Sequence, residues 1–238
     1  MRPEPLLDIS DLHSGYGGKP VLAGLNIRIM PGEIVAIIGR NGVGKTTLMK
    51  TLMGLLPTTG GKIAFNGQSL NPLPPYSRAR LGLGYVPQGR EVFGRMSVTE
   101  NLETGLSICA GRAPAGRMNE IHGYFPILRE RARQRAGTLS GGQQQQLAIG
   151  RVLMGGPDMV FLDEPSEGIQ PNIVQDIARL MVRLNAEKGL SVLFVEQNID
   201  MIRAMAQRCY VMDKGRITAE LGPDEIRDRA EMRRHLAV

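Results

Sequence analysis

The sequence feature that most constrains the fold is an aliphatic run that leads directly into a glycine-rich loop. Residues 34–38 read Ile-Val-Ala-Ile-Ile, and a β-branched run of this kind is typical of a strand buried on both faces. Residues 39–46 then fit the pattern GxxxxGK[ST], and apolar residues at helical spacing continue over residues 45–56. The order strand, glycine loop, helix predicts a loop that binds phosphate.

The residue types in this loop suit phosphate binding. Glycines let successive backbone N–H groups turn inward, and the N-terminus of the next helix adds free N–H groups and a favourable dipole. Lys45 is expected to reach the β- and γ-phosphates, and the Thr46 hydroxyl is expected to ligate Mg²⁺. A chance glycine-rich turn is the alternative, but it does not require the flanking strand and helix. The expected nucleotide-binding residues are Gly39, Arg40, Asn41, Gly42, Val43, Gly44, Lys45, Thr46 and Thr47.

Short apolar strands alternate with helical segments along most of the chain, which predicts an α/β fold with a mostly parallel sheet. The first 30 residues alternate apolar and polar residues in short runs, which indicates half-buried strands. Residues from about 97 to 155 read as mostly helical, with an interruption near 111–117, and suggest an inserted lobe. Further strands are expected at 62–66, 83–86, 159–162, 191–195, 208–212 and 216–221, and helices at 173–188 and 224–236.

Composition excludes several classes of protein. The chain has 238 residues, of which 42% are hydrophobic and 22% charged, values that fit a globular protein and neither a disordered nor a fibrous one. Its longest apolar runs are far below the ~20 residues that cross a bilayer. The net charge of +6 permits an anionic partner, but 4% aromatic residues and no tryptophan argue against a base-stacking surface. Two cysteines and a start without a signal-peptide pattern predict a cytoplasmic protein.

A pair of carboxylates follows the apolar strand expected at 159–162. Asp163 and Glu164 are expected at the carboxyl edge of the parallel sheet, beside the phosphate loop. In that place Asp163 would bind Mg²⁺, and Glu164 would orient and polarise an attacking water molecule. The alternative is that these acids only cap the following helix. The phosphate loop earlier in the chain favours the catalytic interpretation.

Residues 139–143 read Leu-Ser-Gly-Gly-Gln and precede a stretch with helical apolar spacing. Ser140 with the backbone N–H groups of Gly141 and Gly142 would make a second anion site at a helix start. An ordinary N-cap formed by Ser140 is the alternative. A second phosphate site in a chain with one phosphate loop makes sense if two copies meet head to tail with two-fold symmetry.

The order of these motifs resembles the nucleotide-binding subunit of ABC transporters over nearly the whole chain. The resemblance implies a P-loop NTPase core with a mostly parallel sheet, an N-terminal antiparallel β subdomain and an inserted helical lobe. In this interpretation the single ATPase domain has its core at residues 1–92 and 156–238 and its lobe at about 93–155. The resemblance also implies that the chain binds ATP and Mg²⁺ and hydrolyses ATP.

The same resemblance assigns roles to individual residues. Tyr16 resembles the aromatic residue that stacks on adenine. Gln88 resembles the glutamine that contacts Mg²⁺ and the attacking water and couples the core to the lobe. The residues that would contact the partner's nucleotide are Ser140, Gly141, Gly142 and Gln143.

Two positions depart from the usual family pattern. Gln197 stands where most members have a histidine, and Gln170 stands where many have an aspartate. A glutamine can still donate to the γ-phosphate, but it does not titrate near neutral pH, so a positional role is expected for Gln197. The expected catalytic set is Glu164, Gln197 and Lys45.

Several segments resemble one branch of the family, the second ATPase subunit of branched-chain amino-acid uptake systems. These segments are residues 85–90 (YVPQGR), 167–171 (EGIQP) and 196–198 (EQN). Residues 39–43 (GRNGV) and 168–171 (GIQP) look most like the urea-uptake members of that group. The substrate would not touch this chain, so no residue encodes it chemically.

The resemblance also implies partners and a location. The partners would be a second ATP-binding subunit, transmembrane permease subunits and, indirectly, a periplasmic solute-binding protein, with no nucleic acid. The chain would be peripheral on the cytoplasmic face of the inner membrane, and permeases would dock in a groove near Gln88 and residues 91–110. One alternative is a soluble ABC ATPase that acts on DNA or ribosomes, although 238 residues leave no room for paired cassettes or long coiled coils. Another is a regulator that only binds nucleotide, against which the intact Lys45, Asp163 and Glu164 argue.

Overall fold

The computed structural model describes residues 4–109 and 115–237. Within these ranges the strands are β1 (Leu7–Tyr16), β2 (Lys19–Ile29), β3 (Ile34–Ile38), β4 (Thr58–Phe65), β5 (Gln68–Ser69), β6 (Leu83–Val86), β7 (Met159–Asp163), β8 (Ser191–Val195), β9 (Arg208–Asp213) and β10 (Arg216–Leu221). The helices are α1 (Lys45–Leu52), α2 (Pro75–Arg80), α3 (Val98–Thr104), α4 (Arg117–Tyr124), α5 (Pro126–Glu130), α6 (Gly141–Met154), α7 (Pro171–Lys188), α8 (Ile199–Met205), α9 (Pro223–Arg227) and α10 (Arg229–Ala237). Short 3₁₀ helices lie at Gly105–Cys109 and Ala136–Thr138.

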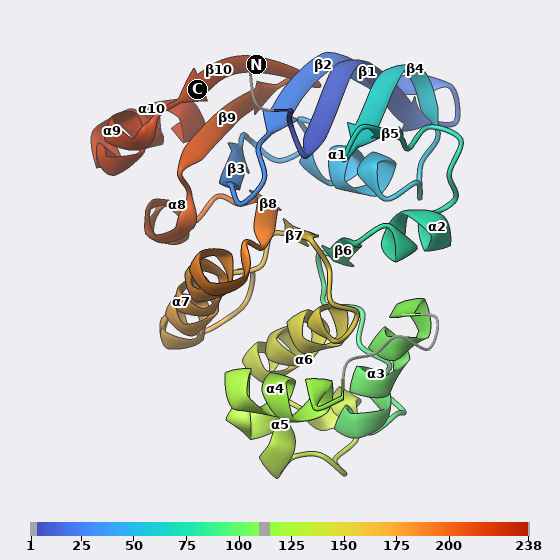
Figure 1. Cartoon of the computed structure of the whole chain (residues 1–238). Helices are drawn as coiled ribbons and strands as arrows, with labels where there is room; N and C mark the ends of the chain where they lie inside the picture. The colour runs from blue at the N-terminus through green and yellow to red at the C-terminus, as the bar shows by residue number, and fades with distance from the viewer. Residues whose placement is uncertain (1–3, 110–114, 238) are drawn as a thin grey trace.

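Among the described residues the strands form two sheets (Figure 1). The antiparallel sheet has the order β2-β1-β4-β5, and the central sheet has the order β10-β9-β3-β8-β7-β6. Strands β9, β3, β8, β7 and β6 run parallel, and β10 alone of the described strands in this sheet pairs antiparallel, with β9. Strands β3, β7 and β8 are buried along their whole length, which explains their uniformly apolar sequences. The predicted α/β class with a mostly parallel sheet is confirmed.

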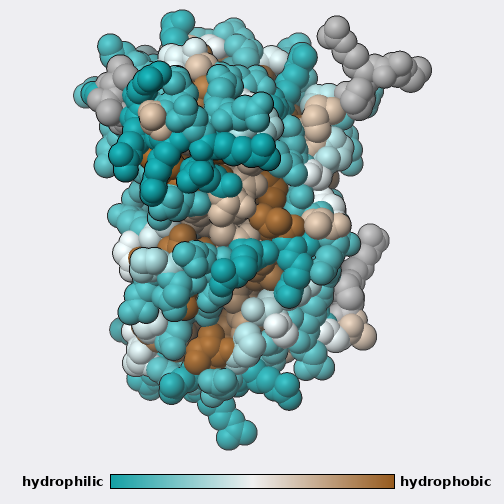
Figure 2. Space-filling model, turned by 90° about the vertical axis from the view of Figure 1, so that its left-hand side faces the viewer, coloured by the Kyte–Doolittle hydropathy of each residue, from teal (hydrophilic) through white to brown (hydrophobic). Residues whose placement is uncertain are grey.

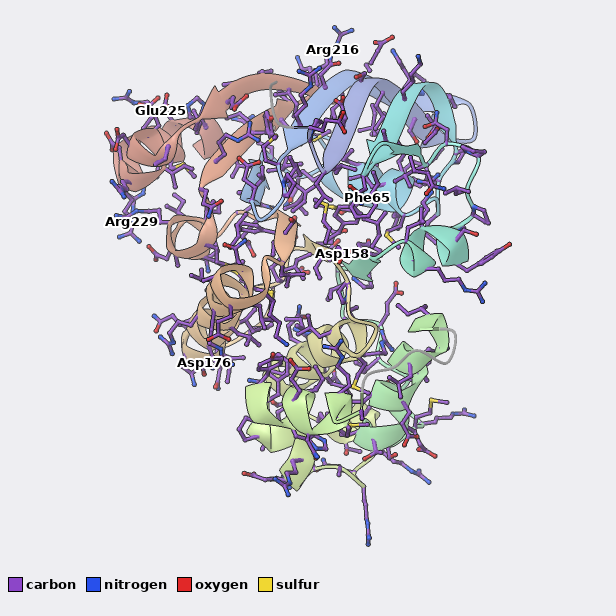
Figure 3. All side chains as sticks on the ribbon, in the orientation of Figure 1. Phe65, Asp158, Asp176, Arg216, Glu225 and Arg229 are labelled. Atoms are coloured by element: carbon purple, nitrogen blue, oxygen red, sulfur yellow. The ribbon has the colours of Figure 1, made fainter. Side chains whose placement is uncertain are left out.

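Helix α1 is packed between the two sheets. Its buried Leu48, Met49 and Leu52 belong to the same apolar cluster as Phe65 of β4 and Phe161 of β7. Figure 3 shows Phe65 directed into the body of the molecule, whereas Asp176, Arg216, Glu225 and Arg229 lie on its outside. The phosphate loop that precedes α1 is therefore held by a helix with apolar support on both sides.

The other face of the central sheet is covered by helices. Alternate residues of β3 (Ile34, Ala36 and Ile38) face a second apolar cluster that includes residues of α3, α4, α6, α7 and α8. Figure 1 shows α3 to α6 gathered as a helical lobe beyond β6 and β7, at the opposite end of the molecule from the antiparallel sheet. Figure 2 shows hydrophobic side chains at mid-height of one face, between an upper and a lower part that are mostly hydrophilic. The division of the chain at residues 93 and 155 remains a prediction.

Some sequence-based expectations for the helices are wrong at their ends. The helix expected over 45–56 ends at Leu52, because Gly54 turns the chain with φ +75°. The helix expected over 224–236 is interrupted at Asp228, so that α9 and α10 are separate. Helices α2 and α8 were not expected, since each is too short to give a clear periodic pattern. The interruption near 111–117 falls partly on residues 110–114, outside the described residues.

Among the residues that the structure describes, no helix combines the length and the apolar character that a bilayer crossing requires.

Candidate functional site

A cavity of about 520 Å³ opens where the phosphate loop meets the carboxyl end of β7. The phosphate loop follows β3, and Glu164 follows β7. Both strands end at the same edge of the parallel sheet, so both segments reach the cavity. Glu167 also lines the cavity, although the sequence reasoning gave it no role. The predicted site residues that line the cavity are Tyr16, Asn41, Gly42, Gly44, Lys45, Thr46, Thr47, Gln88 and Glu164.

The phosphate loop depends on glycine at two of its positions. A Cβ atom at Gly39 would collide with the carbonyl oxygen of Met212. Gly44 has φ +112° and directly precedes α1, and a Cβ atom there would approach Leu22 and Met212 within about 3 Å. These close approaches pack the loop against β9 and β2, and the first residues of α1 line the cavity, where the N–H groups of a helix start are free to bind an anion.

Lys45 is the first residue of α1 and is 5% exposed. Its Nζ donates hydrogen bonds to the carbonyl oxygens of Gly39 (2.8 Å) and Arg40 (2.9 Å), and it lies 3.7 Å from Oε1 of Glu164. Burial lowers the pKa of Lys45, and the negative charges of Glu164 and Asp163 oppose that decrease. The ammonium group is therefore fixed between the phosphate loop and the end of β7.

Asp163 forms the end of β7 and is 1% exposed. Its Oδ1 accepts a hydrogen bond from Oγ1 of Thr46 (3.1 Å), and its Oδ2 accepts one from the hydroxyl of Tyr85 (3.3 Å). Burial raises the pKa of Asp163 to about 6, although these hydrogen bonds act in the opposite direction. Burial makes the ionised form of this carboxylate unfavourable, and a nearby cation would stabilise it.

The Thr46 hydroxyl and the Asp163 carboxylate make a fitting pair of ligands for Mg²⁺. Oxygen donors of this kind suit a hard cation, and Mg²⁺ is commonly held by one or two protein groups together with substrate phosphates. Within the described ranges, no group of three or more His, Cys, Asp or Glu side chains is arranged to hold a metal ion. The two oxygen donors of Thr46 and Asp163 suit a metal that completes its ligands with phosphate oxygens and water.

Glu164 is the centre of a polar network. Its Oε2 accepts a hydrogen bond from Nε2 of Gln88 (3.2 Å), and its Oε1 accepts one from Nε2 of Gln197 (3.2 Å). Gln197 also donates to Oδ1 of Asn41 in the phosphate loop (2.6 Å), and Gln88 also donates to Glu167 (3.0 Å). Glu164 itself has φ +47°, an uncommon backbone conformation for a residue with a side chain. The network fixes the direction of its carboxylate.

A buried carboxylate holds the backbone of the two loops that carry this network. Glu196 is 3% exposed, and its Oε1 accepts hydrogen bonds from the backbone N–H groups of Gln197 (2.7 Å) and Asn198 (3.0 Å). Its Oε2 accepts one from the N–H of Ser166 (3.1 Å). Glu196 thereby ties the loop after β8 to the loop after β7. The sequence reasoning missed this role, and the only signal was the position of Glu196 directly after a buried strand.

The Leu-Ser-Gly-Gly-Gln segment does not join the cavity within one chain. Ser140 is the N-cap of α6 and forms a capping box with Gln143: the Gln143 N–H donates to the Ser140 hydroxyl (3.4 Å), and the Ser140 N–H donates to the Gln143 side chain (3.0 Å). Ser140 is exposed. The capping interpretation thus holds within the chain, and the helix end remains open to a second molecule.

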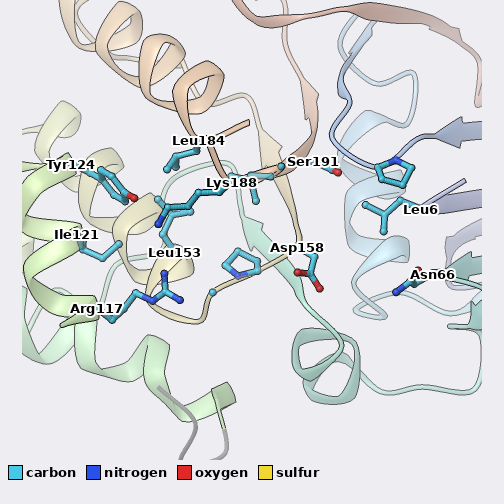
Figure 4. Close-up of a pocket in the computed structure, with 15 residues that line it drawn as sticks. Leu6, Asn66, Arg117, Ile121, Tyr124, Leu153, Asp158, Leu184, Lys188 and Ser191 are labelled. Carbon is cyan, nitrogen blue, oxygen red and sulfur yellow. The ribbon is translucent and has the colours of Figure 1, made fainter. Parts of the chain in front are cut away.

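Other cavities lie away from these residues. One of about 340 Å³ lies between the lobe and the core, lined by Arg117 and Tyr124 of α4 and Lys188 of α7 (Figure 4). Another, of about 400 Å³ and mostly apolar, lies between β6, α2 and the start of the lobe, where Phe93 and Arg151 line it. Neither contains a predicted phosphate-loop or catalytic residue.

The fold and this cavity define a nucleotide-binding domain of the P-loop NTPase type. The family model for ABC transporters matches residues 22–167. The high-affinity branched-chain amino acid transport ATP-binding protein BraG of Pseudomonas aeruginosa is 41% identical over 212 residues, which cover 89% of this chain and 91% of that protein. The lipopolysaccharide export system ATP-binding protein LptB of Escherichia coli is 35% identical over 224 residues, which cover 92% of this chain and 92% of that protein.

A solved structure agrees with these relatives. A dimeric ATP-binding cassette in a post-hydrolysis state, bound to ADP and phosphate, has a TM-score of 0.83 and 25% identity, covering 91% of this chain and 98% of that one. The chain belongs to the ABC transporter family and is an ATP-binding subunit with the ATPase activity of that family.

Proposed function

We propose that this chain hydrolyses ATP with Mg²⁺ to drive the import of branched-chain amino acids or urea through separate permease subunits. The observation that carries the ATPase part is the Glu164 carboxylate, held by Gln88 and Gln197 in the same cavity as Lys45. A carboxylate fixed by neutral donors beside a phosphate loop can orient a water molecule towards the γ-phosphate. The 41% identity to BraG supports the amino-acid branch, and residues 39–43 and 168–171 support the urea members.

The phosphate loop, Lys45 and the metal-binding pair have distinct roles in this proposal. The backbone N–H groups of residues 39–44 and the start of α1 would bind the phosphates, and Lys45 would neutralise charge between the β- and γ-positions. Thr46 and Asp163 would hold Mg²⁺, with Gln88 as a further contact. When bound, Mg²⁺ supplies positive charge that offsets the phosphate oxygens.

Glu164 and Gln197 would act at the point of attack. Glu164 would orient the water molecule and accept its proton. One N–H of Gln197 would hold the carboxylate, and the other, which donates to Asn41, would turn to the γ-phosphate. Tyr16 lines the cavity and is 45% exposed, so its ring is available to stack on the base.

A second ATP-binding subunit would complete the site. Ser140, Gly141, Gly142 and Gln143 begin α6 away from the cavity of their own chain. In a head-to-tail dimer this helix end would face the partner's nucleotide and bind its γ-phosphate. The dimeric state of the solved cassette supports this arrangement.

The permease subunits would dock in the apolar groove between β6, α2 and the lobe. Phe93 is 50% exposed there, and the Arg151 guanidinium lies 4.9 Å from the centre of its ring. Phe and Arg side chains are enriched at protein–protein interfaces relative to the rest of the surface. The chain would then act as a peripheral subunit on the cytoplasmic face of the inner membrane, and a periplasmic solute-binding protein would deliver the substrate on the other side.

The variant Glu164→Gln tests the ATPase part. It keeps the shape of the side chain and removes the carboxylate, so turnover should fall by at least about 100-fold while ATP binding persists. An ATP-bound dimer should then accumulate, which size-exclusion chromatography with ATP and Mg²⁺ would detect. Hydrolysis at the wild-type rate would refute the mechanism. Uptake of labelled leucine and labelled urea in a strain that lacks this chain would decide the substrate.

A further inference from the structure

Arg90 lies between the loop after β6, the loop after β7 and the start of α6. Its Nη2 donates a hydrogen bond to the carbonyl oxygen of Glu167 (2.9 Å) and a longer one to that of Gly168 (3.4 Å). The guanidinium group also lies against Gly141, the first residue of α6, where a Cβ atom would come within 3.0 Å of Nη1. This one side chain therefore contacts parts of the cavity wall and the lobe together.

The backbone around Arg90 is held in an unusual conformation. Gly89, Arg90 and Glu91 have φ values of +79°, +72° and +44°, and consecutive left-handed residues with side chains are uncommon because Cβ crowds the carbonyl oxygen. The far end of this segment is held by Arg151 of α6, whose Nη2 donates to the carbonyl oxygen of Glu91 (2.9 Å). Such a conformation persists only where the surroundings fix it.

The segment continues directly into the catalytic network. Gln88, two residues before Arg90, donates to the carboxylates of Glu164 and Glu167. Gln88 and Arg90 thus contact the same short loop after β7. Gln88 binds the side chains of Glu164 and Glu167, and Arg90 binds the backbone carbonyl oxygens of Glu167 and Gly168.

We propose that Arg90 is a positioning residue that couples the start of α6 to the alignment of Gln88 and Glu164. The proposal rests on the function proposed above and adds a residue to it. A shift of α6 moves Arg90 through its packing on Gly141, and Arg90 moves the loop of residues 164–168 through two carbonyl contacts. The loop in turn carries the Glu164 carboxylate. The flat guanidinium suits this task, because Nη2 donates to both carbonyl oxygens while the planar group packs on Gly141.

ATPase assays on the full chain test the proposal with Arg90→Ala, Arg90→Lys and, as a matched control, Arg233→Ala at an exposed arginine of α10. Arg90→Ala should lower kcat by about 10- to 100-fold, because a displacement of ~1 Å at the reacting groups has an effect of that size. KM for ATP should change less than about threefold, since the phosphate loop is untouched. Arg90→Lys should recover only part of kcat, and millimolar guanidinium chloride should raise the rate of Arg90→Ala but not that of Arg233→Ala.

The outcomes separate a positioning role from a structural one. Wild-type kcat in Arg90→Ala, or a loss confined to KM, would overturn the proposal. If Arg90→Ala has no thermal unfolding transition and so does not fold, Arg90→Lys tests the proposal instead. A wild-type kcat in Arg90→Lys would also overturn the proposal. Glu164→Gln measured in parallel keeps the two proposals apart. An active Glu164→Gln refutes the proposed function, whereas an inactive Glu164→Gln beside a fully active Arg90→Ala refutes only the role of Arg90.

Discussion

The side-chain amide of Gln197 donates a hydrogen bond to the carboxylate of Glu164, with 3.2 Å between the nitrogen and the oxygen. The two residues follow neighbouring parallel strands, β8 and β7, and are 33 positions apart in the sequence. A second bond from Gln197 to Asn41 joins this contact to the phosphate loop. A residue that does not titrate therefore connects the predicted base to the predicted nucleotide loop.

Removing this connection should slow hydrolysis without weakening nucleotide binding. In Gln197→Ala the Glu164 carboxylate loses one donor, and a hydrogen bond to a charged group contributes about 1.5 to 3 kcal/mol. We expect kcat to fall about 10-fold or more, with KM for ATP within about threefold of the wild type, in a steady-state ATPase assay. A Gln197→Ala variant with unchanged kcat would contradict the role given to this residue.

Gln197→His provides the companion measurement. An imidazole has an ordinary pKa near 6.5, so this variant should acquire a dependence of kcat on pH between about 5.5 and 7.5. The wild-type profile should lack that component, because an amide does not titrate there. Identical pH profiles for the two proteins would show that position 197 does not act on the reacting groups.

Tyr16 should contribute to ATP affinity and not to turnover. Stacking of a base on an aromatic side chain contributes about 1 to 3 kcal/mol, and the exposure of Tyr16 favours the lower part of that range. We expect Tyr16→Ala to raise the Kd for ATP about 5- to 20-fold, whereas Tyr16→Phe should leave it nearly unchanged. Equilibrium binding of a fluorescent ATP analogue measures both, and equal affinities for Ala and Phe would exclude stacking.

Asp163 should make the metal-free protein sensitive to pH. Its folded-state pKa of about 6 lies above the ordinary value of 3.8, so only well below that ordinary value is the carboxyl group protonated in both the folded and the unfolded state, without effect on stability. As the pH rises from about 4 to about 6, the unfolded state ionises while the folded state keeps its proton, so the free energy of unfolding decreases; above about pH 6 both states are ionised and the decrease is complete. The total loss is about 3 kcal/mol, and most of it is reached by pH ~6.

Asp163→Asn removes that charge and should remove this pH dependence. In EDTA at pH 8 the variant should melt several degrees above the wild type, and the difference should shrink towards pH 4.5. Differential scanning calorimetry across this range measures the effect. A constant difference between the two proteins at all pH values would show that the carboxylate does not titrate in the folded state as described.

Arg78 should be essential to the stability of the helix that follows the phosphate loop. This residue of α2 is 3% exposed, and it donates to the carbonyl oxygens of Thr51 (2.7 Å), Leu52 (2.8 Å) and Leu73 (2.9 Å). Arg78→Ala leaves these carbonyls without their donor and should lower the free energy of unfolding by about 2 to 4 kcal/mol. Urea denaturation followed by circular dichroism measures it, with the exposed Arg80→Ala as a control expected within about 0.5 kcal/mol of the wild type.

The local sequence was sufficient for the strands and loops whose conformation depends on near neighbours. Strands β6 and β8 lie at the predicted residues 83–86 and 191–195, because short, mostly apolar segments between turn-forming or polar residues leave few alternatives to a buried strand. The phosphate loop was predictable for the same reason, since its glycines and the helix that follows are contiguous. Asp163 and Glu164 could be placed beside it because parallel strands end at one edge of the sheet.

The tertiary structure decided what depends on residues far apart in the chain. The carbonyl oxygens of Thr51 and Leu52 at the end of α1 accept hydrogen bonds from Arg78, which lies 26 positions after Leu52. Glu196 and Arg90 acquire their roles only when the loops after β6, β7 and β8 come together. A local pattern specifies backbone conformation and which face is buried, because both follow from neighbouring residues. The partners of a buried carboxylate or a guanidinium are set by packing across the whole sheet, so only the folded chain determines them.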